Sequence, residues 1–379
     1  MDFRFTEEQL AVRDAARDFA RTELAPGVID RDVHQHFPDD LRQKMGDMGF
    51  MGMMTSPNHG GGGMDTVSYV LAVEEIARID ASAAVIMSVN NSLVCWGLEK
   101  FGTEDQKSRF LTPVASGRIS GAFCLSEPEA GSDATQQHTS AEDRGDHYLL
   151  NGTKNWITNG SSAGIYLVMA QTDASRRHKG INCLVVEKGQ AGFVIGKKED
   201  KMGIRGSDTH SLMFQDVNVP KTSRIGDEGA GFTFAMSTLN GGRIGIAAQA
   251  VGIAAGALDL ALRYAQERKA FGKPLCEHQA IQFKLAQMAM KTDAARLMVL
   301  QAAWLKDQGL DFIKEAAMAK LYASTIAQEV TTEAVQIHGG YGYVREFHVE
   351  RMMRDAKITE IYEGTSEIQH LVIARELLR

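Results

Sequence analysis

Cysteine is scarce in the sequence, and no two cysteines lie close together. Only four occur in 379 residues, at positions 95, 124, 183 and 276, and they form no CxxC pair. This spacing argues against a zinc site or a disulfide framework and is typical of a protein in a reducing compartment. We therefore expect no metal site.

Runs of basic residues and a leader segment are also lacking. The net charge is −7, and no stretch concentrates Lys and Arg, so a nucleic-acid partner is not expected. The opening residues MDFRFTEEQL contain neither the basic nor the apolar region of a secretory signal. We expect a bacterial cytoplasmic protein, although the mature form of a mitochondrial matrix protein would look the same.

One hydrophobic run, Ile244 to Leu262, approaches the length that spans a bilayer. Gln249 and Asp259 interrupt it, and Gly and Ala are more frequent in it than Leu and Ile. Small residues allow helices to approach closely, so the run predicts a helix buried in a soluble bundle and not a membrane span.

Common catalytic motifs are absent. The segment from Gly226 to Gly231 is glycine-rich, but its spacing is not GxGxxG, and it is expected to be a loop before a helix. HExxH, GxSxG and the kinase motifs are missing as well. Residue patterns alone therefore leave the active site unassigned.

Hydrophobic periodicity divides the chain into three parts. Thr6 and Gln9 form a capping-box pattern, and residues 41–48, 66–78 and 81–101 continue a helical N-terminal part. After residue 226 the pattern is helical again, with breaks at 271–274 and 339–340 and a last helix that begins near Thr365.

The middle part contains short apolar segments with no helical pattern between them. They predict an antiparallel sandwich or barrel, and Asn151-Gly152 predicts a hairpin turn. The expected fold is α+β and multidomain, with an all-α domain at 1–118, a β-domain at 119–226 and a four-helix bundle at 227–379.

Six motifs occur in the order typical of one enzyme family. They are Phe123–Asp133 (FCLSEPEAGSD), Lys154–Gly160 (KNWITNG), Arg268–Lys273 (RKAFGK), Glu277–Ile281 (EHQAI), Gln336–Gly340 (QIHGG) and Ile361–Gln369 (IYEGTSEIQ). From the first helix to the last, the chain resembles the acyl-CoA dehydrogenases. Residues 87–92 and 242–246 resemble the short-chain, butyryl-CoA branch.

The resemblance implies FAD-dependent conversion of an acyl-CoA into a trans-2-enoyl-CoA, with Glu363 as the base that removes the α-proton. Gly364 would leave room for the substrate beside the backbone. A solvated glutamate at a helix N-terminus is the alternative for Glu363. Some relatives carry the base on an earlier helix, but the matching position here is Gly242, which supports Glu363.

The resemblance also implies the residues that bind FAD. Taken alone, Trp156 would more often be a core aromatic, and Arg268 an exposed cation at a helix end. Arg268 would reach the pyrophosphate of a neighbouring subunit's FAD, and Gln279, Gln336, Gly339 and Gly340 the adenosine part. The full set is Phe123, Leu125, Ser126, Ser132, Trp156, Ile157, Thr158, Arg268, Phe271, Gln279, Gln336, Gly339, Gly340, Thr365 and Glu367.

Substrate contacts are expected from Ser132, Asn240, Arg243 and Gly364. A structural ion pair is the alternative role of Arg243. Glu129 and Asn240 depart from the residues that the family often carries, Gly and Asp, so the details of acyl-CoA binding stay open.

The implied partners are the acyl-CoA substrate, electron-transferring flavoprotein and three further copies in a homotetramer of paired dimers. A branched-chain dehydrogenase, an acyl-CoA oxidase and a flavoprotein without turnover are alternatives.

Overall fold

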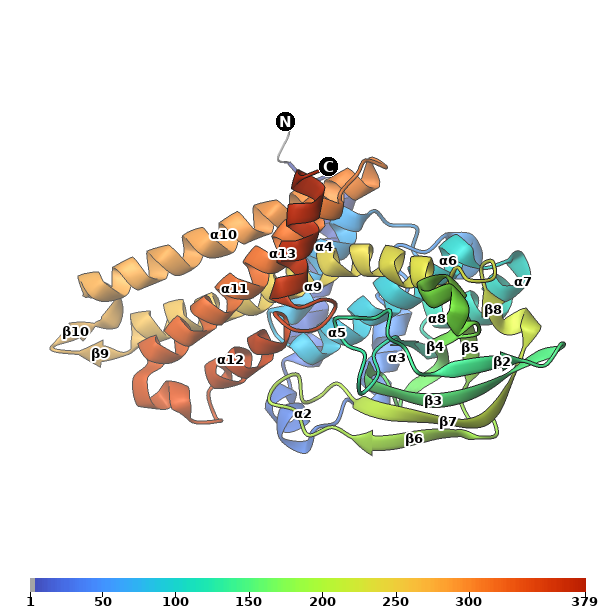
Figure 1. The fold of residues 1–379 in the computed structure, drawn as a ribbon. Helices are drawn as coiled ribbons and strands as arrows, with labels where there is room; N and C mark the ends of the chain where they lie inside the picture. Colours follow the sequence, from blue (N-terminus) through green and yellow to red (C-terminus); the bar gives the residue numbers. More distant parts are fainter. Residues whose placement is uncertain (1–3) are drawn as a thin grey trace.

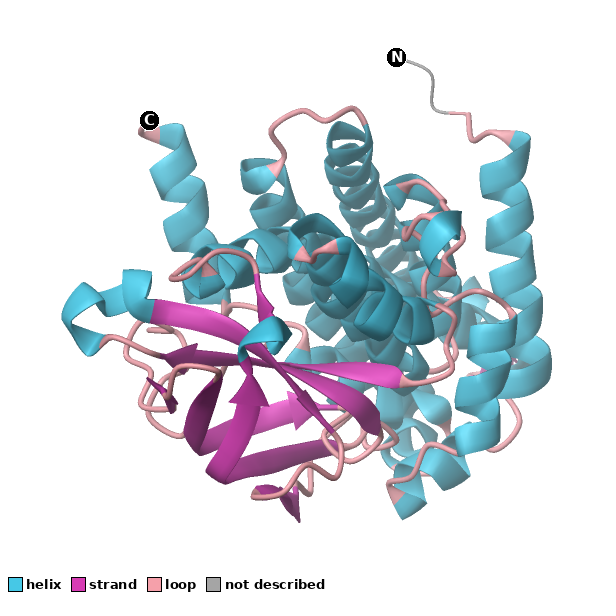
Figure 2. Ribbon diagram, turned by 90° about the vertical axis from the view of Figure 1, so that its right-hand side faces the viewer, coloured by secondary structure: helices cyan, strands magenta, loops and turns pink. Residues whose placement is uncertain are grey.

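Helices from both ends of the chain pack together, and the sheet formed by the middle of the chain lies at one side of them (Figures 1 and 2). The computed structural model describes residues 4–379. The N-terminal helices are α1 (Glu7–Phe19), α2 (Val28–His34), α3 (Asp39–Asp47), α4 (Thr66–Ala77), α5 (Ala81–Ser88), α6 (Trp96–Phe101), α7 (Glu104–Gln106) and α8 (Thr112–Ala115).

A local signal begins the first N-terminal helix as predicted. The backbone N–H of Gln9 donates to the Thr6 hydroxyl at 3.2 Å, and the Gln9 side chain accepts from the Thr6 N–H at 3.0 Å, which completes the capping box of α1. The predicted helix 81–101 is continuous but changes to a π-helical segment at Val89–Cys95. It is buried throughout most of its length.

The middle strands form one mixed sheet in the order β6-β7-β3-β2-β4-β5-β8, with β1 beside β4. The prediction of a purely antiparallel sheet is corrected in one respect, because β1 runs parallel to β4, as does the single pair between β2 and β4. The strands are β1 (Ser120–Cys124), β2 (Ser140–Asp143), β3 (His147–Thr158), β4 (Ala163–Gln171), β5 (Ile181–Glu187), β6 (Phe193–Lys198), β7 (Thr209–Pro220) and β8 (Arg224–Ile225).

Strand β4 is buried on both faces and joins two hydrophobic cores. Alternate side chains point to opposite faces of a strand. Ile165 and Leu167 therefore belong to the core shared with the helices, whereas Tyr166 and Val168 belong to a second core inside the β-region. The sheet is thus fixed against the helices by one of its own central strands.

The predicted hairpin at Asn151-Gly152 is wrong, because β3 continues through both residues. Gly152 adopts φ 144°, and a Cβ there would lie 2.6 Å from the Thr139 hydroxyl oxygen. Asn151 exchanges two hydrogen bonds with Asp216 on β7, at 2.9 and 3.0 Å. The glycine is needed for a close approach between strands and not for a turn.

The C-terminal helices are α9 (Gly231–Glu267), α10 (Gln279–Asp307), α11 (Ile313–His338), α12 (His348–Ile358) and α13 (Ser366–Leu377), and a small hairpin, β9 (Lys269–Ala270) and β10 (Lys273–Pro274), joins α9 to α10. Among the described residues, the stretches Ala81–Phe101 and Gly231–Glu267 are apolar and long enough to cross a membrane, but 94% and 83% of their most apolar windows are buried within the protein. The run at 244–262 is therefore a buried helix, as predicted. One continuous core unites these helices with the N-terminal ones.

Candidate active site

A tight turn between α12 and α13 carries Glu363 and Gly364. Glu363 has φ 53° and Gly364 has φ 96°, so both lie in the left-handed region that a non-glycine residue rarely adopts. The Gly364 carbonyl accepts hydrogen bonds from the Lys320 ammonium and from the Gln369 amide, the latter at 2.8 Å. Two neighbouring helices, α11 and α13, thus hold a strained turn in place.

The Glu363 carboxylate points into the protein. Both of its oxygens are buried and have no hydrogen-bond partner. Burial raises the pKa of Glu363 to about 7, against the opposing charges of Lys320 and then Arg243. The alternative of a solvated glutamate is wrong, and the site instead holds a carboxylate whose proton affinity matches a base that works near neutral pH.

Helix α9 makes room for this carboxylate. A Cβ on Gly242 would lie 2.1 Å from the Glu363 Oε2 atom and 3.0 Å from the Leu93 Cδ2 atom. The missing side chain at Gly242 and the carboxylate of Glu363 therefore occupy one space. Any larger residue at position 242 would therefore collide with Glu363 in its present position.

Arg243 lies on the same side of α9. It is buried and donates to the Asn240 side-chain oxygen at 2.6 Å, while its Nε atom has no partner. Among residues 4–379 it forms no ion pair within 4.0 Å, which argues against the structural ion pair as its role. Its charge nevertheless acts on Glu363.

Trp156 lies in a bulge of β3 and turns out of the sheet. The pairing of β3 with β7 shifts register between Lys154 and Ile157, and Trp156 has φ 62°. Its side chain is 63% exposed, so it is not the core aromatic of the alternative. A bulge is a common way to re-aim one side chain at a functional site.

The structure brings Ser126 next to this bulge, because the Asn155 N–H donates to the Ser126 carbonyl at 2.9 Å. Phe123 and Leu125 are partly buried against the helical core, and Thr158 ends β3. The Ile157 side chain is buried in the β core. Ile157 could therefore meet a cofactor only through its backbone.

A buried ion pair, which sequence reasoning missed, holds the loop that follows β1. The Lys154 ammonium donates to Glu127 at 2.7 Å and to the Leu125 carbonyl at 3.1 Å. Glu127 in turn accepts from the backbone of His138 at 2.6 Å. The pairing is non-local, although the lysine within KNWITNG is a signal that could have prompted the search.

Ser132 is exposed in the same loop. Glu129, the departure from the family pattern, is also exposed and lies 3.6 Å from His138. At the start of α13 the Thr365 hydroxyl accepts from the Ile368 N–H at 3.4 Å, as predicted for a helix cap, and Glu367 is exposed in the first turn.

A second group of predicted residues lies at the far end of the bundle. Arg268 ends α9, and its guanidinium lies 5.6 Å from the centre of the Tyr341 ring. Phe271, in the turn of the β9–β10 hairpin, is 98% exposed. A cavity of about 630 Å³ lies beside Arg268 and is lined by Tyr264, Leu275, Ile337, His338, Gly339, Gly340, Tyr341, Val344 and Glu346. Gln279 and Gln336 are exposed at the same end.

The two groups are far apart within one chain. Gly242, beside Glu363, and the end of α9 at Glu267 are separated by roughly 38 Å of helix at about 1.5 Å per residue. In Figure 1 the β9–β10 hairpin lies at the left end of the bundle, away from the α12–α13 turn. Within one chain the two groups therefore lie in separate parts of the helical bundle.

Comparison with known proteins shows the family of the chain. Models of the acyl-CoA dehydrogenase N-terminal, middle and C-terminal domains match residues 6–118, 122–217 and 229–378. The division of the chain near residues 118 and 226 stays a prediction. The chain is 48% identical over the full length of both proteins to the short-chain specific acyl-CoA dehydrogenase of Clostridium acetobutylicum.

Two solved structures are similarly close. The butyryl-CoA dehydrogenase of Megasphaera elsdenii has 50% identity and a TM-score of 0.98, with both chains fully covered. A chain in the structure of the electron transferring flavoprotein of Acidaminococcus fermentans has 50% identity and a TM-score of 0.99, again with full coverage. The chain thus belongs to the acyl-CoA dehydrogenase family and is an FAD-dependent oxidoreductase.

Proposed function

We propose that this enzyme removes the α-proton and the β-hydrogen of a short-chain acyl-CoA, with Glu363 as the base, and releases the trans-2-enoyl-CoA. The observation that carries the proposal is the Glu363 carboxylate, which is buried, lacks any hydrogen-bond partner and has a pKa of about 7. Structural carboxylates that are buried are normally paired. An unpaired one inside a family of proton-abstracting enzymes is kept for its reactivity.

The surroundings of Glu363 suit removal of a very weakly acidic C–H proton. Desolvation makes the carboxylate a stronger base, while Arg243 and Lys320 keep part of the population ionised near neutral pH. The strained turn fixes the direction of the carboxylate. Gly364 offers backbone without a side chain, next to the place where the thioester would lie.

FAD, when bound, supplies the acceptor for the β-hydrogen, which leaves as hydride. The residues present fit this cofactor: an aromatic turned outward by a bulge (Trp156), a capped helix N-terminus (α13) and an exposed arginine beside a cavity (Arg268). We assign the flavin side to Phe123, Leu125, Ser126, Ser132, Trp156, Ile157 (backbone only) and Thr158, with Thr365 and Glu367 from the same chain. Arg268, Phe271, Gln279, Gln336, Gly339 and Gly340 are assigned to the site of a neighbouring copy.

Close packing behind Glu363 supports a short acyl chain. A Cβ on Gly245, one turn after Gly242, would lie 2.5 Å from the Tyr69 hydroxyl and 2.6 Å from the Ser88 hydroxyl. Leu93 lies on the other side of Gly242. These side chains fill the interior beyond the carboxylate, and several relatives about 50% identical to this chain are named for short-chain or butyryl substrates.

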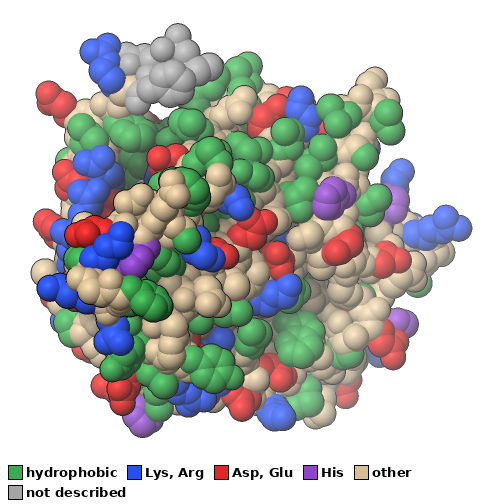
Figure 3. Space-filling model, turned by 90° about the vertical axis from the view of Figure 1, so that its left-hand side faces the viewer, with side chains coloured by type: hydrophobic (Ala, Val, Ile, Leu, Met, Phe, Trp, Pro, Cys, Tyr) green, Lys and Arg blue, Asp and Glu red, His purple; other side chains and the backbone are tan. Residues whose placement is uncertain are grey.

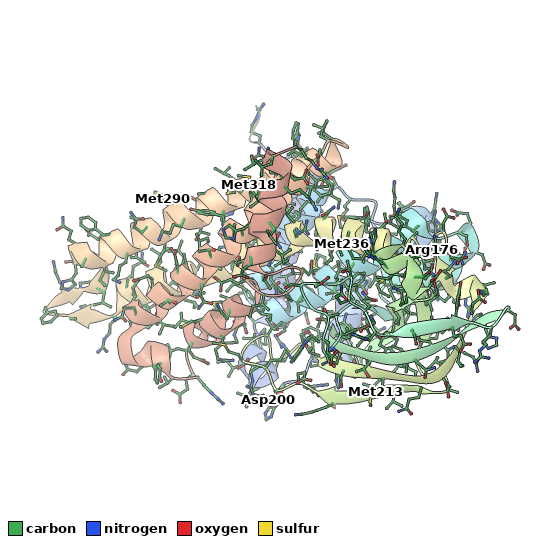
Figure 4. All side chains as sticks on the ribbon, in the orientation of Figure 1. Arg176, Asp200, Met213, Met236, Met290 and Met318 are labelled. Atoms are coloured by element: carbon green, nitrogen blue, oxygen red, sulfur yellow. The ribbon has the colours of Figure 1, made fainter. Side chains whose placement is uncertain are left out.

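A repeated apolar pattern on α10 supports the homotetramer. Phe283, Met290, Leu297 and Trp304 recur every seven residues, and each is more than half exposed in the single chain. Met290 lies at the outer edge of the bundle (Figure 4), and the face at the end of the bundle mixes hydrophobic and charged side chains (Figure 3). Seven-residue spacing is the pattern with which helices pair, so a second copy is the expected partner of this stripe.

Electron-transferring flavoprotein is the proposed acceptor of the electrons from reduced FAD. The similarity to a chain in the flavoprotein structure from Acidaminococcus fermentans supports this partner. Fast reoxidation by oxygen alone would instead favour the oxidase alternative.

Anaerobic titration with butyryl-CoA, octanoyl-CoA and isobutyryl-CoA, followed by visible absorbance, tests the proposal. Butyryl-CoA is expected to bleach the flavin at the lowest concentration. A Glu363→Gln variant should keep its FAD but bleach roughly 10²–10⁴-fold more slowly, as expected for loss of a general base. Preferential bleaching by isobutyryl-CoA would move the substrate to branched chains, and near-normal bleaching of Glu363→Gln would reject Glu363 as the base.

A further inference from the structure

We propose that Lys320 is a positioning residue for the base: its ammonium group holds the Glu363–Gly364 turn and places a positive charge near the Glu363 carboxylate. The inference rests on the proposed function, in which Glu363 removes the substrate proton. No sequence motif pointed to Lys320, which lies in the middle of α11. Its side chain is completely buried.

A buried lysine without an ion pair is costly to keep. Among the described residues, no carboxylate lies within 4.0 Å of the Lys320 ammonium, and burial lowers the pKa of Lys320 to about 8. A methionine would fill similar space without the cost of desolvating a charge. The position therefore calls for a reason beyond packing.

The hydrogen bond to the turn is only part of that reason. Lys320 donates to the Gly364 carbonyl, but Gln369 already donates to the same oxygen at 2.8 Å. A neutral donor from α13 thus satisfies this carbonyl. Lys320 adds something that Gln369 cannot, which is a positive charge beside Glu363.

Charged and titratable groups face Glu363 from several elements. Lys320 from α11 acts on it most strongly, followed by Arg243 from α9. Tyr69 from α4 and Tyr362 in the turn itself face it as neutral hydroxyls, because burial raises the pKa of both.

Three further charged residues act on Lys320 or Arg243 and so affect Glu363 indirectly. Glu360 and Glu367 favour the charged form of Lys320, and Arg375 from α13 acts on Arg243. Lys320 therefore donates a hydrogen bond to the turn and interacts electrostatically with Glu363 and with the neighbouring carboxylates. Its removal should raise the proton affinity of Glu363, while removal of Gln369 should not.

Two matched variants separate charge from hydrogen bonding. Lys320→Gln removes the charge and keeps a polar donor, and Gln369→Met removes a donor and keeps the charge. We expect the pH midpoint of the rate of flavin bleaching by butyryl-CoA to rise by roughly one unit in Lys320→Gln. The midpoint of Gln369→Met should stay within a few tenths of a unit of the wild type, on that same scale.

Hydrogen exchange of the peptide covering residues 359–368 gives a readout that does not depend on turnover. Exchange should quicken in Lys320→Met, which has neither charge nor donor, and less so in Lys320→Gln. If Lys320→Gln does not fold, Lys320→Met takes its place in the pH measurement. Equal exchange in Lys320→Met and the wild type would overturn the positioning role.

The outcomes distinguish this inference from the proposed function. If the wild type is not bleached by any acyl-CoA, the proposed function fails. If the wild type is bleached and the Lys320→Gln profile coincides with it, only the role of Lys320 fails. A midpoint that rises equally in Lys320→Gln and Gln369→Met would also overturn it, since any loosening of the turn would then explain the change.

Discussion

At the scale of single residues, the buried carboxylate of Glu363 makes the stability of the protein depend on pH. The unfolded chain leaves this carboxyl at its ordinary pKa near 4.5, whereas burial raises it to about 7 in the folded protein. The folded state therefore binds a proton more tightly, and stability is lost as the pH rises between these two values. A shift of this size corresponds to roughly 3 kcal/mol.

Glu363→Gln should therefore stabilise the protein, and more so at high pH. The amide has no charge to desolvate, so the gain in the free energy of unfolding is expected to be about 2 kcal/mol larger at pH 8 than at pH 5. Denaturation of the FAD-loaded variant and wild type at both pH values measures this difference. Glu8→Gln, at an exposed site on α1, is the control and should show no such gain. A pH-independent effect of Glu363→Gln would contradict the raised pKa.

At the scale of elements, helix α9 needs a residue without a side chain at position 242, where the Glu363 carboxylate approaches it. Gly242→Ala should push the carboxylate out of position, because the new Cβ would lie 2.1 Å from Glu363 Oε2. A displacement of this kind is expected to cost on the order of 10²-fold in the rate of flavin bleaching. The neighbouring Gly241→Ala is the matched control, since its Cβ would meet only the Lys306 ammonium, at 3.7 Å. Comparable losses in both variants would mean that helix flexibility, and not the space at Gly242, matters.

Structural features that depend on residues adjacent in the sequence were predictable, and features that depend on residues distant in the sequence were not. The capping box at Thr6 and the cap at Thr365 involve side chains within three residues of the helix that they begin. The Asn151-Gly152 hairpin was mispredicted because the need for glycine comes from Thr139, which lies directly before β2.

The same distinction holds for the site. The proposed base and cofactor contacts rest on the resemblance of contiguous motifs, and they stay predictions. Lys320 and Gln369 meet at Gly364 only after α11, α13 and the turn have packed together. The Lys154–Glu127 ion pair likewise joins two segments far apart in the chain. Such long-range contacts leave no periodic or spacing signal.

At the scale of the whole molecule, we propose that each chain contributes residues to two different sites. The Glu363 turn and the Arg268 end of α9 lie far apart in one chain, yet the resemblance to the family assigns both to FAD binding. In the proposed assembly a two-fold axis would bring the Arg268 end of one copy to the Glu363 region of another and would repeat the exchange in reverse. The exposed Phe271 and the cavity beside Arg268 are then parts of a shared surface.

Mixed assemblies test this exchange directly. Arg268→Ala and Glu363→Gln chains should each be nearly inactive alone. When they are co-expressed, a mixed pair contains one site with an intact Glu363 from the first chain and an intact Arg268 from the second. Random pairing through a two-fold interface then restores roughly a quarter of the sites, measured as butyryl-CoA-dependent bleaching per bound flavin.

The control pair is Arg268→Ala with Phe271→Ala. Both changes lie in the same half-site, so every site in the mixture receives a damaged half and no activity should return. Restoration in the first mixture but not in the second can arise only if Arg268 acts across the interface. If neither mixture recovers activity while both form mixed assemblies, Arg268 serves its own chain. The distance along α9 would then have to be bridged by a rearrangement of the bundle.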